Sequence, residues 1–282
     1  MEPPPISYPC LQLSGRHDEL EIASVVLFEA GCLGTDELDE STFRAYFPPE
    51  SNLSRLHLRL VNDFPALCSV VIESLPDEDW LSIWKRDFHG FSLGKKFFVL
   101  PSWEEAPSTP RTVVHIDPER AFGTGTHDTT RLSVELIEDF GRAEDSVIDA
   151  GSGTGVLSIA AALLGCRPVD AIEIDPEAAA CLRANILRNQ LAQVVRVHQC
   201  SISDANLNLA DLVLANLNIS ILRDSWTQIS KWVRVGGSLI ASGLLLEQTD
   251  GFLEALPPGQ RLVEHRTAGD WAALLIQKTS DA

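Results

Sequence analysis

The chain has 282 residues, of which 45% are hydrophobic, and a formal net charge of −18. This length allows one large domain or two modest ones with a full core. No apolar run approaches the roughly 18 residues of a membrane span, and the first residues lack the basic and apolar regions of a signal peptide. With no basic run longer than two residues, direct nucleic-acid binding is not expected. The acidity is compatible with a basic protein partner, or with solubility alone.

Cysteine usage points to a reducing compartment. The 6 cysteines are scattered along the chain and form no C-x-x-C pair. A disulfide framework or a zinc site is therefore not expected, and neither is any other metal site. Reduced thiols in the core of a cytoplasmic protein are the expected state.

Residues 1–75 are expected to form a small α/β domain behind a frayed N-terminus. The patterns predict strands at 8–13, 43–47 and 56–61, and helices at 17–30 and 65–75. The strand at 56–61 is predicted because Leu-His-Leu-Arg-Leu-Val alternates apolar and polar side chains. The order strand, helix, strand, strand, helix favours a ferredoxin-like sandwich.

Residues 76–90 are expected to be a linker between two domains. Three acidic residues, 77–79, favour the start of a helix over 76–88. Trp80 and Trp84 stand four residues apart and share one face of that helix. We expect the two indole rings to pack the linker onto a neighbouring domain.

Residues 91–282 are expected to form the larger domain. Strands are predicted at 94–103 and 112–116, and a helix at 130–140, with a long loop of small and polar residues before the helix. Strands and helices then alternate, which is typical of a parallel sheet covered by helices. The predicted strands are 147–150, 169–174, 194–198, 211–215, 238–244, 261–267 and 271–277, and the helices are 156–164, 176–190, 219–233 and 247–256. The last two strands form a hairpin, so one edge of the sheet should be antiparallel.

The most informative motif is Val147-Ile-Asp-Ala-Gly-Ser-Gly-Thr-Gly155, an apolar strand that ends in an acid and three alternating glycines. A second acid, Glu173, follows the next predicted strand, 22 residues after Gly151. In an open α/β sheet this arrangement forms a nucleoside-binding crevice. The G-x-G-x-x-G spacing of dinucleotide sites is absent, and Asp149 would place negative charge where a pyrophosphate lies. A ribose-containing, cationic cofactor without phosphate fits better, and we predict S-adenosylmethionine.

Each residue of the motif has a candidate role. Gly151 and Gly153 would let the backbone approach the methionine part and the ribose. Glu173 would accept hydrogen bonds from both ribose hydroxyls. Asp149 would orient the loop or meet the ammonium group of the cofactor, or else cap the following helix. Asp175 lies on the same side as Glu173, and the alternative for Asp175 is capping of the helix that starts at Pro176.

A third site element follows the apolar strand Asp211-Leu-Val-Leu-Ala-Asn216. Asn216 would lie at the carboxyl edge of the sheet, beside the methyl donor. Its amide oxygen could accept a hydrogen bond from a substrate amine and direct the nitrogen lone pair at the methyl group. The alternative role is capping of the helix that starts at Ile219, which Asn218 could also perform.

Several of these motifs together resemble the PrmA family, the methyltransferases of ribosomal protein L-eleven (L11). The matching segments are FGTGTHDTT (122–130), DAGSGTG (149–155), AIEIDP (171–176), LVLANL (212–217) and SGLL (242–245), with DWLSIWKRDF (79–88) and LPSW (100–103). The FGTGTHDTT loop is the specific part, because generic methyltransferases lack it. The resemblance covers most of the chain and is weakest before residue 75.

The resemblance implies a Rossmann-like class I methyltransferase domain with a mostly parallel seven-stranded sheet. It also implies methyl transfer from S-adenosylmethionine to amines of free or assembling L11, namely lysine side chains and the N-terminal α-amino group. Phe122, Gly123 and Thr130 fall on cofactor-binding positions of the family, and Gly151, Glu173 and Asn216 fall on its other cofactor positions. Residues 1–75 fall on its substrate-recognition part. The family usually has Asp where Glu173 stands, and Glu can also bind a ribose diol.

Alternatives remain at this stage. A methyltransferase of the same fold could act on another protein or on a small amine. A protein of a different class would keep the nucleoside site as a non-catalytic scaffold that binds a ribosomal protein. His127, in the matching loop, is a candidate base for the amine or an anchor of the loop.

Overall fold

The computed structural model describes residues 7–16, 19–20, 23–24, 26–27, 30–39, 41–65, 67–76, 88–117 and 125–280. The chain divides into two compact units, Met1–Phe88 and His89–Ala282. The linker helix predicted at 76–88 falls almost entirely outside the described residues, so the predicted linker limits stay predictions. No helix in the described ranges is long and apolar enough to cross a membrane.

The first unit contains a four-stranded antiparallel sheet in the order β2-β3-β1-β4. Its elements are β1 (Ser7–Ser14), β2 (Gly34–Asp39), β3 (Thr42–Tyr46), α2 (Ser54–Asp63) and β4 (Ser69–Pro76). The described residues of the helix predicted at 17–30 are helical up to residue 27, and Leu20, Ala23 and Leu27 are buried. The predicted strands at 8–13 and 43–47 are confirmed as β1 and β3. The ferredoxin-like assignment stays an interpretation.

Two predictions in this unit are wrong. Residues 56–61 belong to α2, because Leu53, Leu56, Leu60 and Phe64 form a stripe of helical period that packs into the core. The alternation of apolar and polar residues suggested a strand because it includes Leu58, but Leu58 is 61% exposed and does not pack in the core. The helix predicted at 65–75 is instead strand β4, which pairs along its whole length with β1.

Strand β2 was not predicted. Its sequence, GTDELD, is acidic, and acidic residues have low strand propensity. Pairing with β3 determines its conformation, and β2 forms the edge of the sheet. Exposed carboxylates at an edge strand also discourage pairing with other chains.

The second unit begins with a three-stranded sheet of β5 (Phe91–Leu93), β6 (Phe97–Leu100) and β7 (Thr112–His115). The strand predicted at 94–103 is confirmed over 97–100 as β6, but it is shorter than predicted and β5 was not predicted. Gly94 adopts a positive φ of 59° and turns the chain between β5 and β6. A Cβ at Gly94 would lie 2.7 Å from Oε1 of Glu138, so the turn approaches this carboxylate closely. The backbone N–H groups of Lys95 and Lys96 donate to the same carboxylate, at 2.7 to 3.0 Å.

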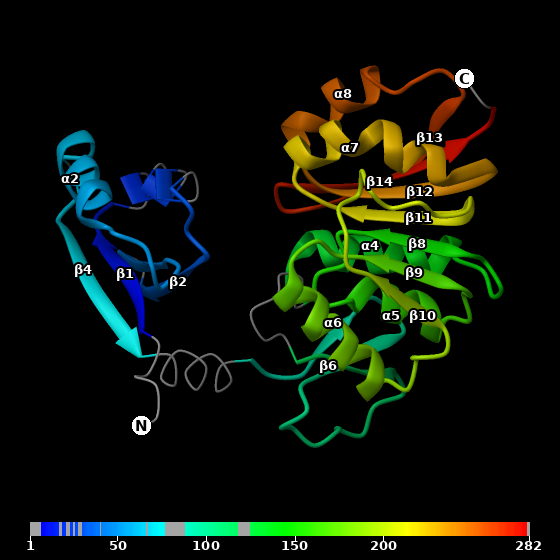
Figure 1. The fold of residues 1–282 in the computed structure, drawn as a ribbon, viewed down its shortest axis with the longest axis horizontal. Coiled ribbons are helices and arrows are strands. Elements are labelled where there is room, and N and C mark those ends of the chain that lie inside the picture. The colour runs from blue at the N-terminus through cyan, green and yellow to red at the C-terminus, as the bar shows by residue number, and fades with distance from the viewer. Residues whose placement is uncertain are drawn as a thin grey trace. The chain divides into compact units, whose positions relative to one another are not determined.

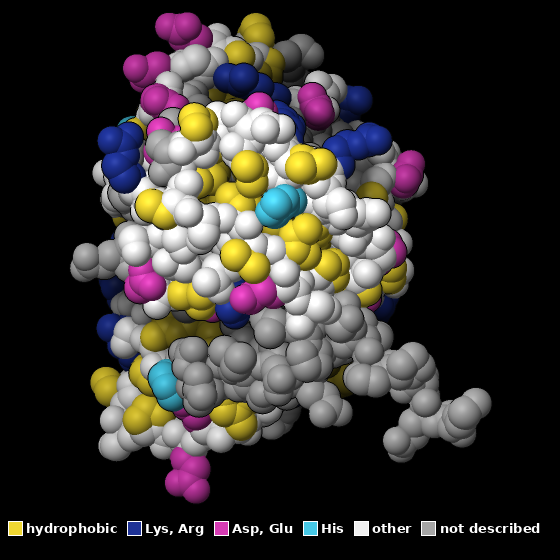
Figure 2. All heavy atoms as spheres, turned by 90° about the vertical axis from the view of Figure 1, so that its left-hand side faces the viewer, with side chains coloured by type: hydrophobic (Ala, Val, Ile, Leu, Met, Phe, Trp, Pro, Cys, Tyr) yellow, Lys and Arg dark blue, Asp and Glu magenta, His cyan; other side chains and the backbone are white. Residues whose placement is uncertain are grey.

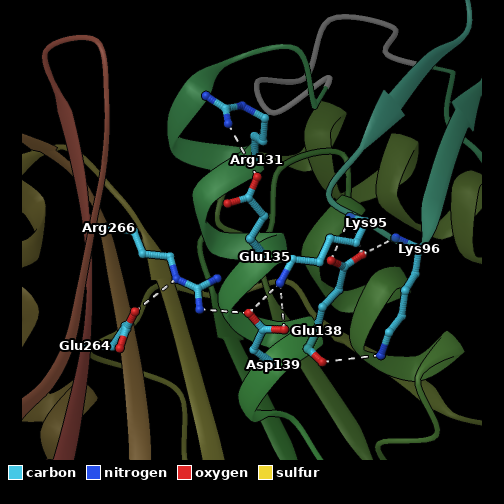
Figure 3. Close-up of polar contacts among 8 residues, drawn as sticks. All are labelled: Lys95, Lys96, Arg131, Glu135, Glu138, Asp139, Glu264 and Arg266. Atoms are coloured by element: carbon cyan, nitrogen blue, oxygen red, sulfur yellow. Dashed lines mark hydrogen bonds and ion pairs between the residues drawn. The ribbon is translucent and has the colours of Figure 1, made fainter.

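Charged side chains reinforce this contact around α4 (Asp128–Phe140), as Figure 3 shows. The Lys95 ammonium donates to both carboxylate oxygens of Asp139, at 3.0 and 3.1 Å. Arg266, on β13 (Gln260–Ala268), donates to Oδ2 of Asp139 at 2.8 Å. Two elements far apart in sequence are thereby held on the C-terminal half of α4.

The main sheet has seven strands in the order β10-β9-β8-β11-β12-β14-β13, which lie side by side in Figure 1. Its strands are β8 (Val147–Ala150), β9 (Val169–Ile172), β10 (Val195–His198), β11 (Ala210–Asn216), β12 (Val233–Leu245), β13 and β14 (Trp271–Lys278). The helices between them are α5 (Val156–Leu163), α6 (Pro176–Arg188), α7 (Ile219–Trp232) and α8 (Leu246–Glu254). The sequence predicted all of these elements, and β12 differs most, since it begins before the predicted 238. Strand β14 pairs antiparallel with both neighbours, which confirms the predicted antiparallel edge.

The strand order reverses at β8. From β8 the chain builds outward through β9 to β10, then crosses back to place β11 on the other side of β8. In open α/β sheets a crevice forms at such a switch point, outside the carboxyl ends of the strands. Asn216 at the end of β11 is brought to that crevice, beside the loop that follows β8, from a position far along the chain.

Candidate active site

A cleft of about 630 Å³ opens at the carboxyl ends of β8, β9, β10 and β11. This volume falls in the range of small-molecule sites. The predicted site residues that line it are Thr130, Gly151, Gly153, Glu173 and Asn216. Further lining residues are Ser152, Val156, Leu157, Ile172, Ile174, Cys200–Ser203, Leu217, Asn218, Ile221 and Ser225.

The glycine loop is held against the end of β9. The N–H groups of Gly151 and Ser152 both donate to the carbonyl of Ile172, at 3.0 and 2.9 Å. Gly151 has a φ of 74°, and a Cβ there would lie 2.5 Å from Cδ2 of Leu217. A larger residue would therefore strain the backbone and displace a wall of the cleft.

Glu173 is fixed by the loop that it faces. Its carboxylate accepts from the Gly153 N–H and from the Asp175 N–H, each at 2.9 Å. Each carboxylate oxygen has two lone pairs, so both oxygens retain capacity for a ligand in the cleft. Glu173 is 9% exposed, and a diol bound there would therefore be largely desolvated. Asp175 caps α6 by accepting from the Glu177 N–H at 2.8 Å, which is the alternative role considered for it.

Asp149 lies beneath the loop. It is 1% exposed and is not among the residues that line the cleft. Its Oδ2 accepts from Oγ of Ser158 on α5 at 2.6 Å. Burial raises the pKa of Asp149 to about 6 against these hydrogen bonds. The contacts favour the loop-orienting role of Asp149, and direct cofactor contact stays a prediction.

Asp149 should make stability depend on pH. Its pKa in the folded protein, about 6, lies above the ordinary value of 3.8, so folding favours the protonated acid. The stabilisation of the folded protein that comes from protonated Asp149 is fully present below pH 3.8 and is lost as the pH rises through 6. The Asp149→Asn variant lacks this titration while keeping an acceptor for Ser158. Relative to wild type, its free energy of unfolding should rise by about 1 kcal/mol between pH 5 and pH 8, measured by urea denaturation. If the difference in free energy of unfolding between the variant and wild type stays constant from pH 5 to pH 8, the pKa of Asp149 is not raised.

Asn216 ends β11 at the cleft. Its Nδ2 donates to Oγ1 of Thr130 at 3.3 Å, and Thr130 is fully buried on α4. This bond leaves the side-chain carbonyl oxygen as the acceptor that a substrate amine could meet. Asn218 caps α7 by accepting from the Ile221 N–H at 2.9 Å, so the capping alternative for Asn216 is wrong.

The loop that carries the family motif is described only from Gly125 onward. Phe122 and Gly123 lie outside the described residues, and their predicted contacts stay predictions. His127 caps α4, its Nδ1 accepting from the Thr129 N–H at 3.3 Å, and its ring packs edge-on against Trp271 at 4.7 Å between centroids. Burial lowers the pKa of His127 below its usual value. These contacts favour the anchoring role.

The sequence interpretation missed one wall of the cleft. Residues 200–203 follow β10, and Ile174 and Ile221 stand at the rim with 67% and 44% of their surface exposed. The strand order could have revealed this wall. Because β10 is parallel to β9, the carboxyl ends of both strands lie at the same edge of the sheet. These exposed isoleucines, beside the predicted ribose acceptor Glu173, offer apolar surface that suits a flat base.

The chemistry of the lining residues fits the predicted cofactor. The described residues around the cleft include no lysine, arginine or histidine, and Glu173 contributes negative charge. Phosphate groups would meet repulsion there, whereas a sulfonium cation and a ribose diol would not. The loop and Glu173 therefore fit S-adenosylmethionine better than a nucleotide with a pyrophosphate.

Comparison with solved structures supports the same class. A ribosomal protein L11 methylase from Lactobacillus delbrueckii subsp. bulgaricus superimposes with a TM-score of 0.63 at 28% identity, covering 68% of this chain and 100% of that chain. The sheet order and the glycine loop at the switch point agree with this likeness. The chain is a class I methyltransferase.

The sequence comparisons define the family more narrowly. The family described as "Ribosomal protein L11 methyltransferase (PrmA)" matches residues 11–279. A ribosomal protein L11 methyltransferase from Bacillus cytotoxicus is 34% identical over 251 residues, which cover 85% of this chain and 80% of that protein. One from Bacillus subtilis is 30% identical over 306 aligned positions, covering 95% and 98%. The chain belongs to the PrmA family of ribosomal protein L11 methyltransferases, which confirms the resemblance seen in the motifs.

Proposed function

We propose that the protein transfers methyl groups from S-adenosylmethionine to amines of ribosomal protein L11. The observation that carries this proposal is the cleft at the switch point, where Glu173 and Asn216 face the glycine loop. Membership of the PrmA family supports L11 as the substrate. Lysine side chains and the N-terminal α-amino group are the amines that the family resemblance implies. Such a substrate would place the enzyme in the cytoplasm.

Different residues of the cleft bind different parts of the cofactor. Glu173 accepts from the ribose hydroxyls, and the loop at Gly151 and Gly153 approaches the methionine part. Thr130 holds Asn216 beside the reacting atoms. When bound, S-adenosylmethionine supplies an electrophilic methyl group, and S-adenosylhomocysteine is the product left after transfer.

The amine must lose its proton before it can attack, because a lysine has a pKa of about 10.4 in water. Desolvation in the cleft lowers this pKa, since burial disfavours the charged amine. The Asn216 oxygen accepts an N–H of the neutral amine and leaves its lone pair for the methyl group. Alignment of this kind can contribute roughly 7–11 kcal/mol to catalysis. The proton leaves to solvent before transfer.

The first unit offers surface for recognition of a protein. Large apolar side chains are exposed on it, including Leu33, Leu58, Val71 and Ile72. Figure 2 shows apolar side chains exposed among uncharged ones on the side that the first unit presents to the viewer. Exposed apolar surface rimmed by polar residues is typical of protein-binding sites. We assign recognition of L11 to this unit.

The experiment compares the full chain with a fragment of residues 89–282, each incubated with purified L11 and S-adenosylmethionine. Calorimetry measures cofactor affinity, and intact-mass spectrometry of L11 counts added methyl groups. The fragment should bind the cofactor within about threefold of the full chain, because the cleft belongs to the second unit. Its kcat/KM on L11 should fall by about 100-fold or more, because positioning of a folded partner is lost.

Other outcomes separate the alternatives. A fragment that modifies L11 as fast as the full chain would contradict the recognition role of the first unit. Transfer to a small amine but not to L11 by either protein would favour the same-fold enzyme with another substrate. Cofactor binding without transfer to any amine would favour the non-catalytic scaffold.

A further inference from the structure

Asn185 on α6 and Asn189, the C-cap residue of α6, face the edge of β7 and the residues that follow it. Asn189 pairs with both backbone groups of His115: its Oδ1 accepts from the N–H at 2.9 Å, and its Nδ2 donates to the carbonyl at 2.7 Å. Asn185 pairs with Asp117 in the same way: its Oδ1 accepts from the Asp117 N–H at 3.0 Å, and its Nδ2 donates to the Asp117 carbonyl at 3.4 Å. Strand β7 is an edge strand of the three-stranded sheet, so these amides take the place of a missing neighbour.

The spacing of the two elements makes this possible. Four residues of a helix rise about 6 Å, and two residues of a strand advance about 6.6 Å. Asparagines at positions i and i+4 of a helix can therefore meet alternate residues of a strand. The match satisfies buried backbone groups that no strand reaches.

Asn185 bonds to the glycine loop, which Asn189 does not, in addition to contacts with Arg188 and Cys181 within α6. Its Nδ2 also donates to the carbonyl of Thr154 at 3.0 Å, and Thr154 lies inside the glycine loop. Asn185 and Thr154 are each 0% exposed. The additional bond of Asn189 returns to the carbonyl of Asn185, in its own helix. One buried amide thus joins the edge of the small sheet to the backbone of the glycine loop.

We propose that Asn185 is a positioning residue for the glycine loop, acting through Thr154 without touching the cleft. Asn185 does not line the cleft, whereas the loop residues Gly151 to Gly153 do. Loss of its amide leaves the Thr154 carbonyl without this buried donor, so the loop should open more often. The consequence for affinity rests on the proposed cofactor, whereas the consequence for the loop does not.

The test uses the full chain and a matched pair of variants, Asn185→Ala and Asn189→Ala. Each loses an amide that pairs with the backbone of residues 115–117, so both should lose thermal stability, and Asn185→Ala should lose more because Asn185 is fully buried. Amide hydrogen exchange of ligand-free protein is followed in the segments 112–117 and 150–157. Calorimetry then measures the dissociation constant of S-adenosylmethionine for the wild type and both variants.

Both variants should exchange faster in 112–117, and only Asn185→Ala should exchange faster in 150–157. Its dissociation constant should rise by about 10-fold, against less than about twofold for Asn189→Ala. Equal behaviour of the two variants in 150–157 would overturn the proposal. If wild type fails to bind the cofactor, the proposed function fails, while the exchange result still decides the role of Asn185.

Asn185→Asp guards against an alanine variant that does not fold. It keeps the shape and the acceptor for the Asp117 N–H, and as a carboxylate it has no N–H for the Thr154 carbonyl. Faster exchange in 150–157 is expected for this variant too. Wild-type protection of that segment in a folded Asn185→Asp variant would also overturn the proposal.

Discussion

Replacing Glu173 with Ala is expected to weaken S-adenosylmethionine binding by about 150- to 20,000-fold. Two hydrogen bonds from ribose hydroxyls to a charged acceptor contribute roughly 1.5–3 kcal/mol each. The structure adds a second effect, because the same carboxylate holds the Gly153 N–H and the Asp175 N–H. The variant therefore loses both a ligand contact and a support of the loop. Calorimetry on the purified protein measures the change in affinity.

Two further variants separate these effects. Asp175→Ala removes a neighbouring acid whose role is to cap α6, so it should cost about 1 kcal/mol of stability and leave affinity within about twofold. Glu173→Asp introduces the residue usual in the family and should retain most of the affinity. Unchanged cofactor affinity in Glu173→Ala would reject the ribose assignment.

Replacing Asn216 with Ala is expected to lower kcat by about 10- to 100-fold while cofactor affinity changes by less than about threefold. The amide donates to Thr130, so its carbonyl oxygen is oriented before the amine arrives. Its loss removes an interaction with the amine in the transition state more than one with the cofactor. Steady-state kinetics on L11 and calorimetry on the cofactor give the two quantities separately.

An isosteric variant tests what Asn216 does for the amine. Asn216→Asp keeps an acceptor but places a negative charge beside the nitrogen, which favours the protonated amine. Its activity should be low near neutral pH and should recover at higher pH. Equal losses of kcat and affinity in Asn216→Ala would make Asn216 mainly a cofactor contact, and full activity would remove it from the site.

The second unit was predictable because its elements carry local signals. The run from Val147 to Gly155 is an apolar strand followed by glycines that adopt positive φ, and few other structures suit that pattern. The helix that starts at Pro176 has its cap, Asp175, directly before it. Repeated alternation of strand and helix then leaves a parallel sheet as the simple solution.

The first unit was predictable only in part, because its local signals conflict. Leu56, Leu58 and Leu60 alternate as in a strand, yet the stripe from Leu53 to Phe64 is also helical. Packing decided between the two periods: the helix places Leu53 on the same buried stripe as Leu56 and Leu60, and it leaves Leu58 exposed. Likewise the acidic β2 is a strand only because β3 is available to pair with it.

For the site, the sequence by itself determined which groups are present: an acid after the second strand, a glycine loop, and an amide at the end of an apolar strand. Only the tertiary structure decided the partners of these groups. It placed Thr130 under Asn216, residues 200–203 on the far wall of the cleft, and Asn185 between β7 and the glycine loop. Those contacts join segments separated by tens of residues. Contacts between such distant residues leave no periodic or local pattern in the sequence, because the order of strands in the sheet determines them and neighbours in the chain do not.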